Sequence, residues 1–183
     1  MRDVELLADL TGKLVRDVRA EIAELTPEEL AWQPDREANN IGVTVWHFSR
    51  WLDMLGVQAL ANRPAAEELW QTRGWAARTG YDPRGIGYLG LGLLTGYTQA
   101  EVAAVPLLTA GQLLEYLEQV SGALREQLLA LPSEALYQPT PGLGGRRTVY
   151  DLLTSVLMGC FSHVGEIEAL KAMRKRALRR TAV

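Results

Sequence analysis

Four long stretches of the chain carry apolar residues at three- and four-residue steps, the spacing of one buried face on an amphipathic helix. They span about residues 3–25, 41–61, 110–131 and 148–173. In the second, apolar residues cover so much of the helix circumference that we expect it to pack on more than one side. No stretch alternates β-branched and polar residues as a half-buried strand does. The pattern therefore predicts an all-α fold.

The predicted helix starts carry side chains that can cap a helix. Thr26, Thr98 and Thr109 each precede a Glu or Gln by three residues, which is the capping-box pattern. Asn40 and Thr148 stand before the second and fourth long stretches, where a side-chain oxygen can accept a hydrogen bond from the first turn.

Residues 62–97 show no lasting period and mix aromatic residues with glycines. A connection this long either covers a functional site or is a solvent-side insertion held by its tryptophans. We therefore predict one domain over residues 1–183, an up-and-down-type four-helix bundle with a long glycine- and aromatic-rich inserted connection.

Composition narrows the classes of function. The net charge of −3 argues against a nucleic-acid partner. The acidic N-terminus does not resemble a signal peptide, and no apolar run is long enough to span a membrane, so we expect a cytoplasmic protein without a membrane partner. The single cysteine, Cys160, excludes an intrachain disulfide and a cysteine-based zinc site.

His47 and His163 are the only two histidines, and each lies on a long predicted helix. They are either ligands or bases of a common site, or hydrogen-bonded polar residues of a helical core. Cys160 lies three residues before His163 and could pair with it as an activated thiol, although a free cysteine in an apolar run is more often a core residue. Residues 142–148 form a glycine-rich loop with Arg146 and Arg147 that can bind an anion, and solvated arginines are the simpler interpretation. The basic residues after position 170 suit the C-terminus of a helix.

Three segments in register resemble the DinB-like (YfiT-like) metalloenzyme superfamily. They are N-N-I-G-V-T-V-W-H-F-S-R around His47, G-Y-T-Q-A-E-V-A-A-V at 96–105 and S-H-V-G-E-I around His163. The resemblance covers nearly the whole chain. It implies a helical bundle, often homodimeric, with a divalent ion such as zinc, nickel or manganese held by three histidines. In better-known branches the ion activates a low-molecular-weight thiol such as mycothiol or bacillithiol.

The chain departs from that pattern at two positions. The family has a histidine one turn before His163, where this chain has Gly159, and Tyr97 stands where one branch has another histidine. Glu166 is the substitute we consider, so the predicted metal set is His47, His163 and Glu166; a water or a ligand group in the gap at Gly159 is the other.

The predicted substrate pocket gathers residues around these imidazoles. It takes in Trp46, Trp51, Tyr97, Gly159 and Cys160. Two functions stay open. The first is a metal-dependent thiol transferase or hydrolase with an incomplete three-histidine site, and no catalytic residue is assigned for it. The second is a metal-free bundle, ligand-binding or stress-associated, with a small apolar molecule or a second subunit at the old site.

Overall fold

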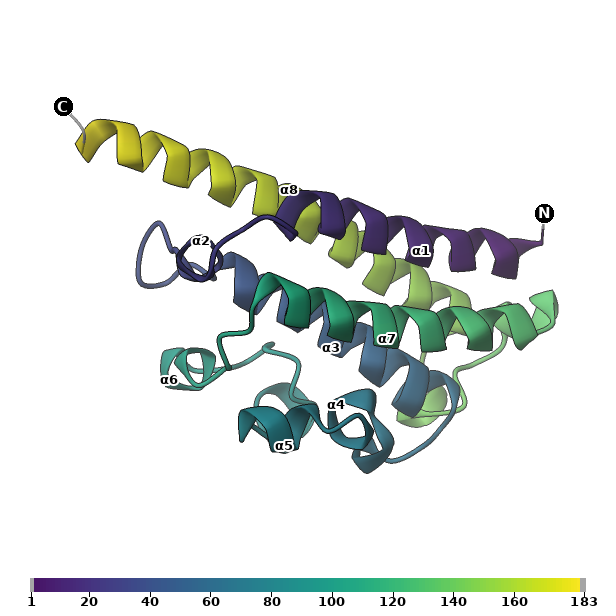
Figure 1. Cartoon of the computed structure of the whole chain (residues 1–183). Coiled ribbons are helices and arrows are strands. Elements are labelled where there is room, and N and C mark those ends of the chain that lie inside the picture. The colour runs from purple at the N-terminus through teal and green to yellow at the C-terminus, as the bar shows by residue number, and fades with distance from the viewer. Residues whose placement is uncertain (1, 182–183) are drawn as a thin grey trace.

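Four long helices lie side by side in the computed structural model, which describes residues 2–181 (Figure 1). They are α1 (Asp3–Ile22), α3 (Ile41–Met54), α7 (Ala110–Ala130) and α8 (Val149–Thr181). Both α1 and α3 pack against α7 and α8. No strand occurs between residues 2 and 181, where Pro139 and Thr148 form an isolated antiparallel bridge. The all-α class is therefore confirmed.

Short helices fill the connections between the long ones. They are α2 (Pro27–Ala31), α4 (Leu69–Thr72), α5 (Trp75–Thr79) and α6 (Gln99–Ala103), together with 3₁₀ turns at Ala65–Glu67, Tyr88–Gly90, Ser133–Tyr137 and Leu143–Gly145. The predicted second helix ends as an α-helix at Met54 and continues as a π-helical turn, Leu55–Leu60. None of the helices described between residues 2 and 181 combines the length and apolarity needed to cross a bilayer.

The predicted caps hold the helix starts in place. Thr26, Thr98 and Thr109 each accept a hydrogen bond from the backbone N–H three residues later and complete a capping box. The Asn40 side chain accepts from the Val43 N–H at 2.8 Å. These bonds satisfy backbone donors that the helix itself leaves open.

The basic end of α8 makes ion pairs within the chain. Lys171 binds Glu21 at 2.7 Å, and Arg174 binds Glu29 at 2.7 Å. These contacts join the C-terminal half of α8 to the last turn of α1 and to α2.

A charged cluster is buried at the last turns of α3. The Arg50 guanidinium is fully buried and lies 2.6 Å from the Glu68 carboxylate and 3.2 Å from that of Asp53. The Tyr116 hydroxyl donates to Asp53 at 2.7 Å. Burial alone would lower the pKa of Arg50, but the field of Tyr116, Glu68 and Asp53 outweighs burial and raises it, so the guanidinium stays charged.

This cluster fastens residues 62–97 onto α3. The second oxygen of Asp53 accepts from the Leu69 N–H at 2.8 Å, and Arg50 donates to the Gly92 carbonyl at 3.4 Å. Gly92 has a positive φ of 66°, and a Cβ there would lie 2.5 Å from the Pro83 carbonyl oxygen, so the close approach requires glycine.

Aromatic packing completes the attachment of that segment. Trp46 of α3 meets Trp70 edge-on at 5.9 Å between ring centroids, and Trp70 stacks on Trp75 at 6.0 Å. All three indoles are fully buried. Residues 62–97 are therefore packed onto the core through their tryptophans.

Removing Glu68 should destabilise the fold, because it leaves the buried charge of Arg50 without its closest partner. We expect Glu68→Ala to lower the free energy of unfolding by about 3 kcal/mol. The buried Arg50 loses its closest ion-pair partner, and water cannot replace it. Urea denaturation of the variant and the parent measures the difference. The matched control is Glu67→Ala, since Glu67 is exposed and pairs with the exposed Arg63 at 3.6 Å; it should change stability by less than about 0.5 kcal/mol. Equal losses in the two variants would contradict the role given to the buried cluster.

Candidate functional site

The helix α3 is open to the outside at only two positions. Every residue from Ile41 to Met54 is buried except His47 and Trp51, which are partly exposed. They are four residues apart and so share one face of the helix. This face is where α3 can meet a ligand.

His163 of α8 lies opposite that face. Its ring centroid is 5.2 Å from that of His47, with the two planes nearly perpendicular, and it stacks on Phe48 at 6.2 Å. The structure thus brings together the two histidines that lie 116 positions apart in the sequence.

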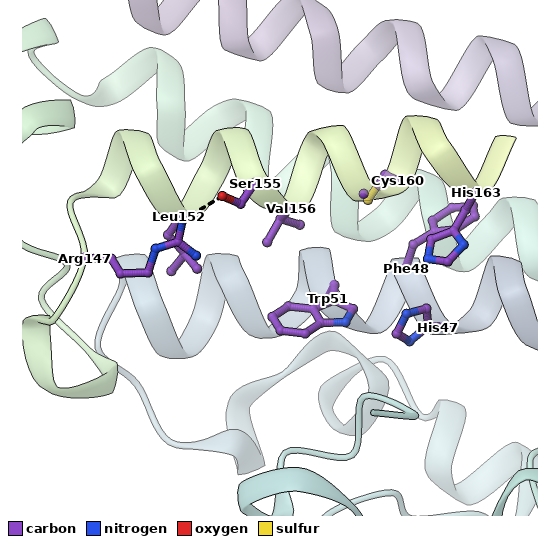
Figure 2. A pocket seen from close by; sticks show the side chains of 10 residues that line it. His47, Phe48, Trp51, Arg147, Leu152, Ser155, Val156, Cys160 and His163 are labelled. Carbon is purple, nitrogen blue, oxygen red and sulfur yellow. Dashed lines mark hydrogen bonds between the residues drawn. The ribbon is translucent and has the colours of Figure 1, made fainter. Parts of the chain in front are cut away.

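A pocket of about 260 Å³ opens between α3 and α8 beside this pair. Figure 2 shows the imidazoles at one end and Arg147 at the other. Its walls are mostly apolar and come from the facing sides of the two helices. The lining residues are His47, Phe48, Trp51, Arg147, Leu152, Ser155, Val156, Gly159, Cys160 and His163.

Hydrogen bonds fix which nitrogen of each imidazole carries a proton. His47 Nδ1 bonds to the carbonyl oxygen of Leu93, and a carbonyl can only accept, so Nδ1–H is the donor. His163 Nδ1 lies 2.6 Å from a carboxylate oxygen of Glu166, which accepts in the same way when ionised. In the neutral rings both Nε2 atoms therefore hold a lone pair. Neither Nε2 has a hydrogen-bond partner within residues 2–181.

His47 is uncharged at neutral pH. Burial, and next the proximity of His163, lower its pKa to about 4, and the bond to Leu93 only partly opposes this shift. A neutral imidazole is the form that accepts a hydrogen bond or binds a metal ion through Nε2.

Glu166 lies beside the Nδ1 atom of His163. Its carboxylate bonds to His163, and between residues 2 and 181 no three His, Cys, Asp or Glu side chains are grouped as a metal site. The donor set therefore fits a divalent ion in part, with two imidazoles and no third protein ligand in place. The acceptors on the two Nδ1 atoms are, however, the kind of partner that metal-binding histidines usually have.

Gly159 leaves free space where the third ligand is expected. It lines the pocket one helical turn before His163, and a Cβ at this position would have no atom within 4 Å. The gap is open volume, available to a water molecule or to part of a ligand.

Cys160 lines the pocket as a neutral thiol. It is almost fully buried, and burial raises the pKa of the thiol to about 12. A nucleophilic cysteine requires a lowered pKa, so the structure favours the core interpretation of this residue.

Two other predicted pocket residues lie elsewhere. Trp46 is next to His47 on α3, and its buried side chain packs against Trp70 and Tyr81. Tyr97 lies on the other side of His47, and its hydroxyl is 3.4 Å from that of Tyr81. It belongs to a separate, more polar pocket of about 360 Å³, lined by Glu37, Asn39, His47, Leu94, Thr95, Tyr97, Gln99 and Val102.

Sequence reasoning found Gly159, Cys160 and His163 in the α8 wall of the main pocket but missed Leu152 and Val156. Leu152, Val156 and Gly159 precede His163 at intervals of three or four residues, the spacing of a single helix face. Extending the face of His163 towards the start of α8 would have found the two that were missed. The sequence indicated Arg147 only as part of a loop that can bind an anion, and not that its side chain reaches the same pocket.

Comparisons with known proteins agree with this fold. The family model of the DinB superfamily matches residues 13–167. A crystal structure titled as the conserved protein of a locus from Enterococcus faecalis superposes with a TM-score of 0.77 at 18% sequence identity, covering 94% of this chain and 97% of that one. No curated protein matches the chain. At this level of identity the structural likeness establishes the fold alone.

The lowered pKa of His47 should make stability depend on pH. The unfolded chain takes up a proton on this imidazole near pH 6.5, whereas the folded protein does so only near pH 4. The stabilisation is therefore complete above about pH 6.5 and is lost as the pH falls from about 6.5 to about 4, by at most about 3 kcal/mol.

Urea denaturation of the parent and of His47→Gln across this pH range measures the effect. We expect the parent to lose up to about 3 kcal/mol more than the variant between pH 7 and pH 4. Proton NMR provides a check, because a chain with two histidines gives few imidazole signals to assign. Parallel pH profiles for the two proteins would show that His47 titrates normally.

Proposed function

Because the chain belongs to the DinB superfamily, we propose that it acts on a small molecule held between α3 and α8, with Nε2 of His47 and His163 as the chemical groups. In this proposal the four long helices form the up-and-down bundle of the family. Residues 62–97 are its inserted connection, which supplies the Leu93 carbonyl to the site. The observation that carries the proposal is the pair of imidazoles whose Nδ1 atoms are both engaged while their Nε2 atoms are not.

A divalent ion is the first candidate for those nitrogens. His47 and His163 would hold zinc, nickel or manganese, and a ligand group or water beside Gly159 would complete the set. A bound divalent ion lowers the pKa of a thiol or a water molecule and makes it a nucleophile at neutral pH. The proposed reaction class is accordingly thiol transfer or hydrolysis. A cytoplasmic location and the homodimer that the family implies remain part of this proposal.

The protein groups around the pair would orient it and line the pocket. Glu166 and the Leu93 carbonyl fix the two rings by their Nδ1 bonds. Phe48, Leu152 and Val156 give the pocket apolar walls.

A metal-free binding protein is the second candidate. It is favoured by the absence, between residues 2 and 181, of three suitably grouped His, Cys, Asp or Glu side chains. In this case the Nε2 atoms accept hydrogen bonds from a hydroxyl, amine or thiol of the bound molecule. The two candidates differ in whether an ion binds at all.

The metal content of the protein distinguishes the two candidate functions. After dialysis against zinc, nickel or manganese together with a small thiol, the parent should retain about one ion per chain, and His47→Ala and His163→Ala should each retain less than about a tenth of that amount. Elemental analysis of untagged protein measures the content. Ser162→Ala is the matched control, since Ser162 adjoins His163 in sequence but bonds back to the Met158 carbonyl outside the pocket. No ion under any loading would leave the metal-free candidate, and equal content in all four proteins would place the ion elsewhere.

Supplying the missing ligand is a complementary test. Gly159→His should raise zinc affinity roughly a hundredfold, because it adds a third imidazole one turn before His163 in open space. Competition with a chromophoric chelator measures the affinity. Gly165→His is the control: a Cβ there also meets nothing within 4 Å, but the position is exposed and outside the pocket. A gain no larger than the control's would show that His47 and His163 are not arranged to share an ion.

A further inference from the structure

The pocket has a second chemically distinct end. Arg147 closes it opposite the imidazoles, as Figure 2 shows. Its guanidinium lies along the first turns of α8, where Nη2 donates hydrogen bonds to the Asp151 carbonyl at 2.8 Å and to the Ser155 hydroxyl at 2.6 Å. A long side chain on an exposed loop is thereby held at the mouth of the pocket.

The positive charge of Arg147 is unpaired among the described residues. Within residues 2–181 no carboxylate forms an ion pair with it, and its Nε and Nη1 groups make no hydrogen bond. The only other titratable groups that line the pocket are the two imidazoles and the neutral thiol of Cys160. A ligand in the pocket therefore meets one unpaired guanidinium with free donors.

Apolar surface separates the two ends. Trp51, Leu152 and Val156 line the pocket between Arg147 and the histidines. Ser155, which binds the guanidinium, is eight residues before His163. At the rise of an α-helix this distance is about 12 Å.

We propose that the pocket takes elongated organic acids, with a carboxylate on Arg147 and an aliphatic or aromatic body running towards His47 and His163. A planar guanidinium with free N–H groups matches the two oxygens of a carboxylate. One unpaired positive charge balances one negative charge, which favours a carboxylate over a phosphate dianion. The inference rests on the proposed function only for the location of the site and does not require a metal ion.

The test compares acids with uncharged analogues of equal length. Octanoate and 1-octanol share an apolar chain and differ in the charged end, so their affinities for chelator-treated protein at pH 8 isolate the guanidinium contact. Removing metal ions first prevents the carboxylate from binding through an ion at the histidines. Isothermal titration of the parent, Arg147→Ala and Arg146→Ala measures both ligands.

We expect Arg147→Ala to weaken octanoate binding about tenfold, the size of one charge-assisted contact at a partly solvated site. The affinity for 1-octanol should stay within about twofold of the parent, which also shows that the variant keeps its pocket. Arg146→Ala is the matched control, because Arg146 is the exposed neighbour that does not line the pocket. It should leave both affinities unchanged.

Three results would overturn the proposal. They are failure of the parent to bind octanoate, equal octanoate affinity in the parent and Arg147→Ala, and an equal loss in Arg146→Ala. None of them bears on metal uptake by His47 and His163, so the acid-binding inference can fail while the proposed function stands. Metal analysis can likewise fail while carboxylate selectivity holds.

Discussion

The fold and the site both depend on the contacts that the buried Arg50 guanidinium makes. A charge without access to water must be matched by acceptors, and Arg50 finds them on Asp53, Glu68 and the Gly92 carbonyl. These partners tie residues 62–97 to α3. Gly92 directly precedes Leu93, whose carbonyl accepts the Nδ1 proton of His47. A core ion cluster therefore positions the acceptor that fixes one of the two imidazoles.

The two imidazoles meet because α3 and α8 pack face to face. In both rings the hydrogen-bond partner places the proton on Nδ1. The Leu93 carbonyl holds the Nδ1 proton of His47, and the Glu166 carboxylate holds that of His163. Each neutral ring then presents an Nε2 lone pair, a group that suits a metal ion as well as a hydrogen-bond donor. Burial strengthens this character at His47 by keeping the ring neutral.

Membership of the DinB superfamily does not specify the chemistry of this chain, which has to be argued from its own residues. The chain has the pair of histidines and partners that orient them, but Gly159 stands where the family resemblance implies a third histidine. The Enterococcus faecalis structure shares the fold at 18% identity, and this similarity does not indicate an activity. Pocket shape, one unpaired arginine and two Nε2 atoms are the features from which a function has to be argued.

The sequence by itself determined the helices and their starts, because apolar periodicity and capping side chains act within a few residues of one another. It also selected His47 and His163, through their rarity and through the family resemblance. Tertiary structure decided which neighbours face the pocket: successive residues on a helix point about 100° apart, so Trp46 enters the core while His47 lines the site. It also brought Arg147 into the pocket, because the reach of a long side chain depends on hydrogen bonds that local sequence does not specify.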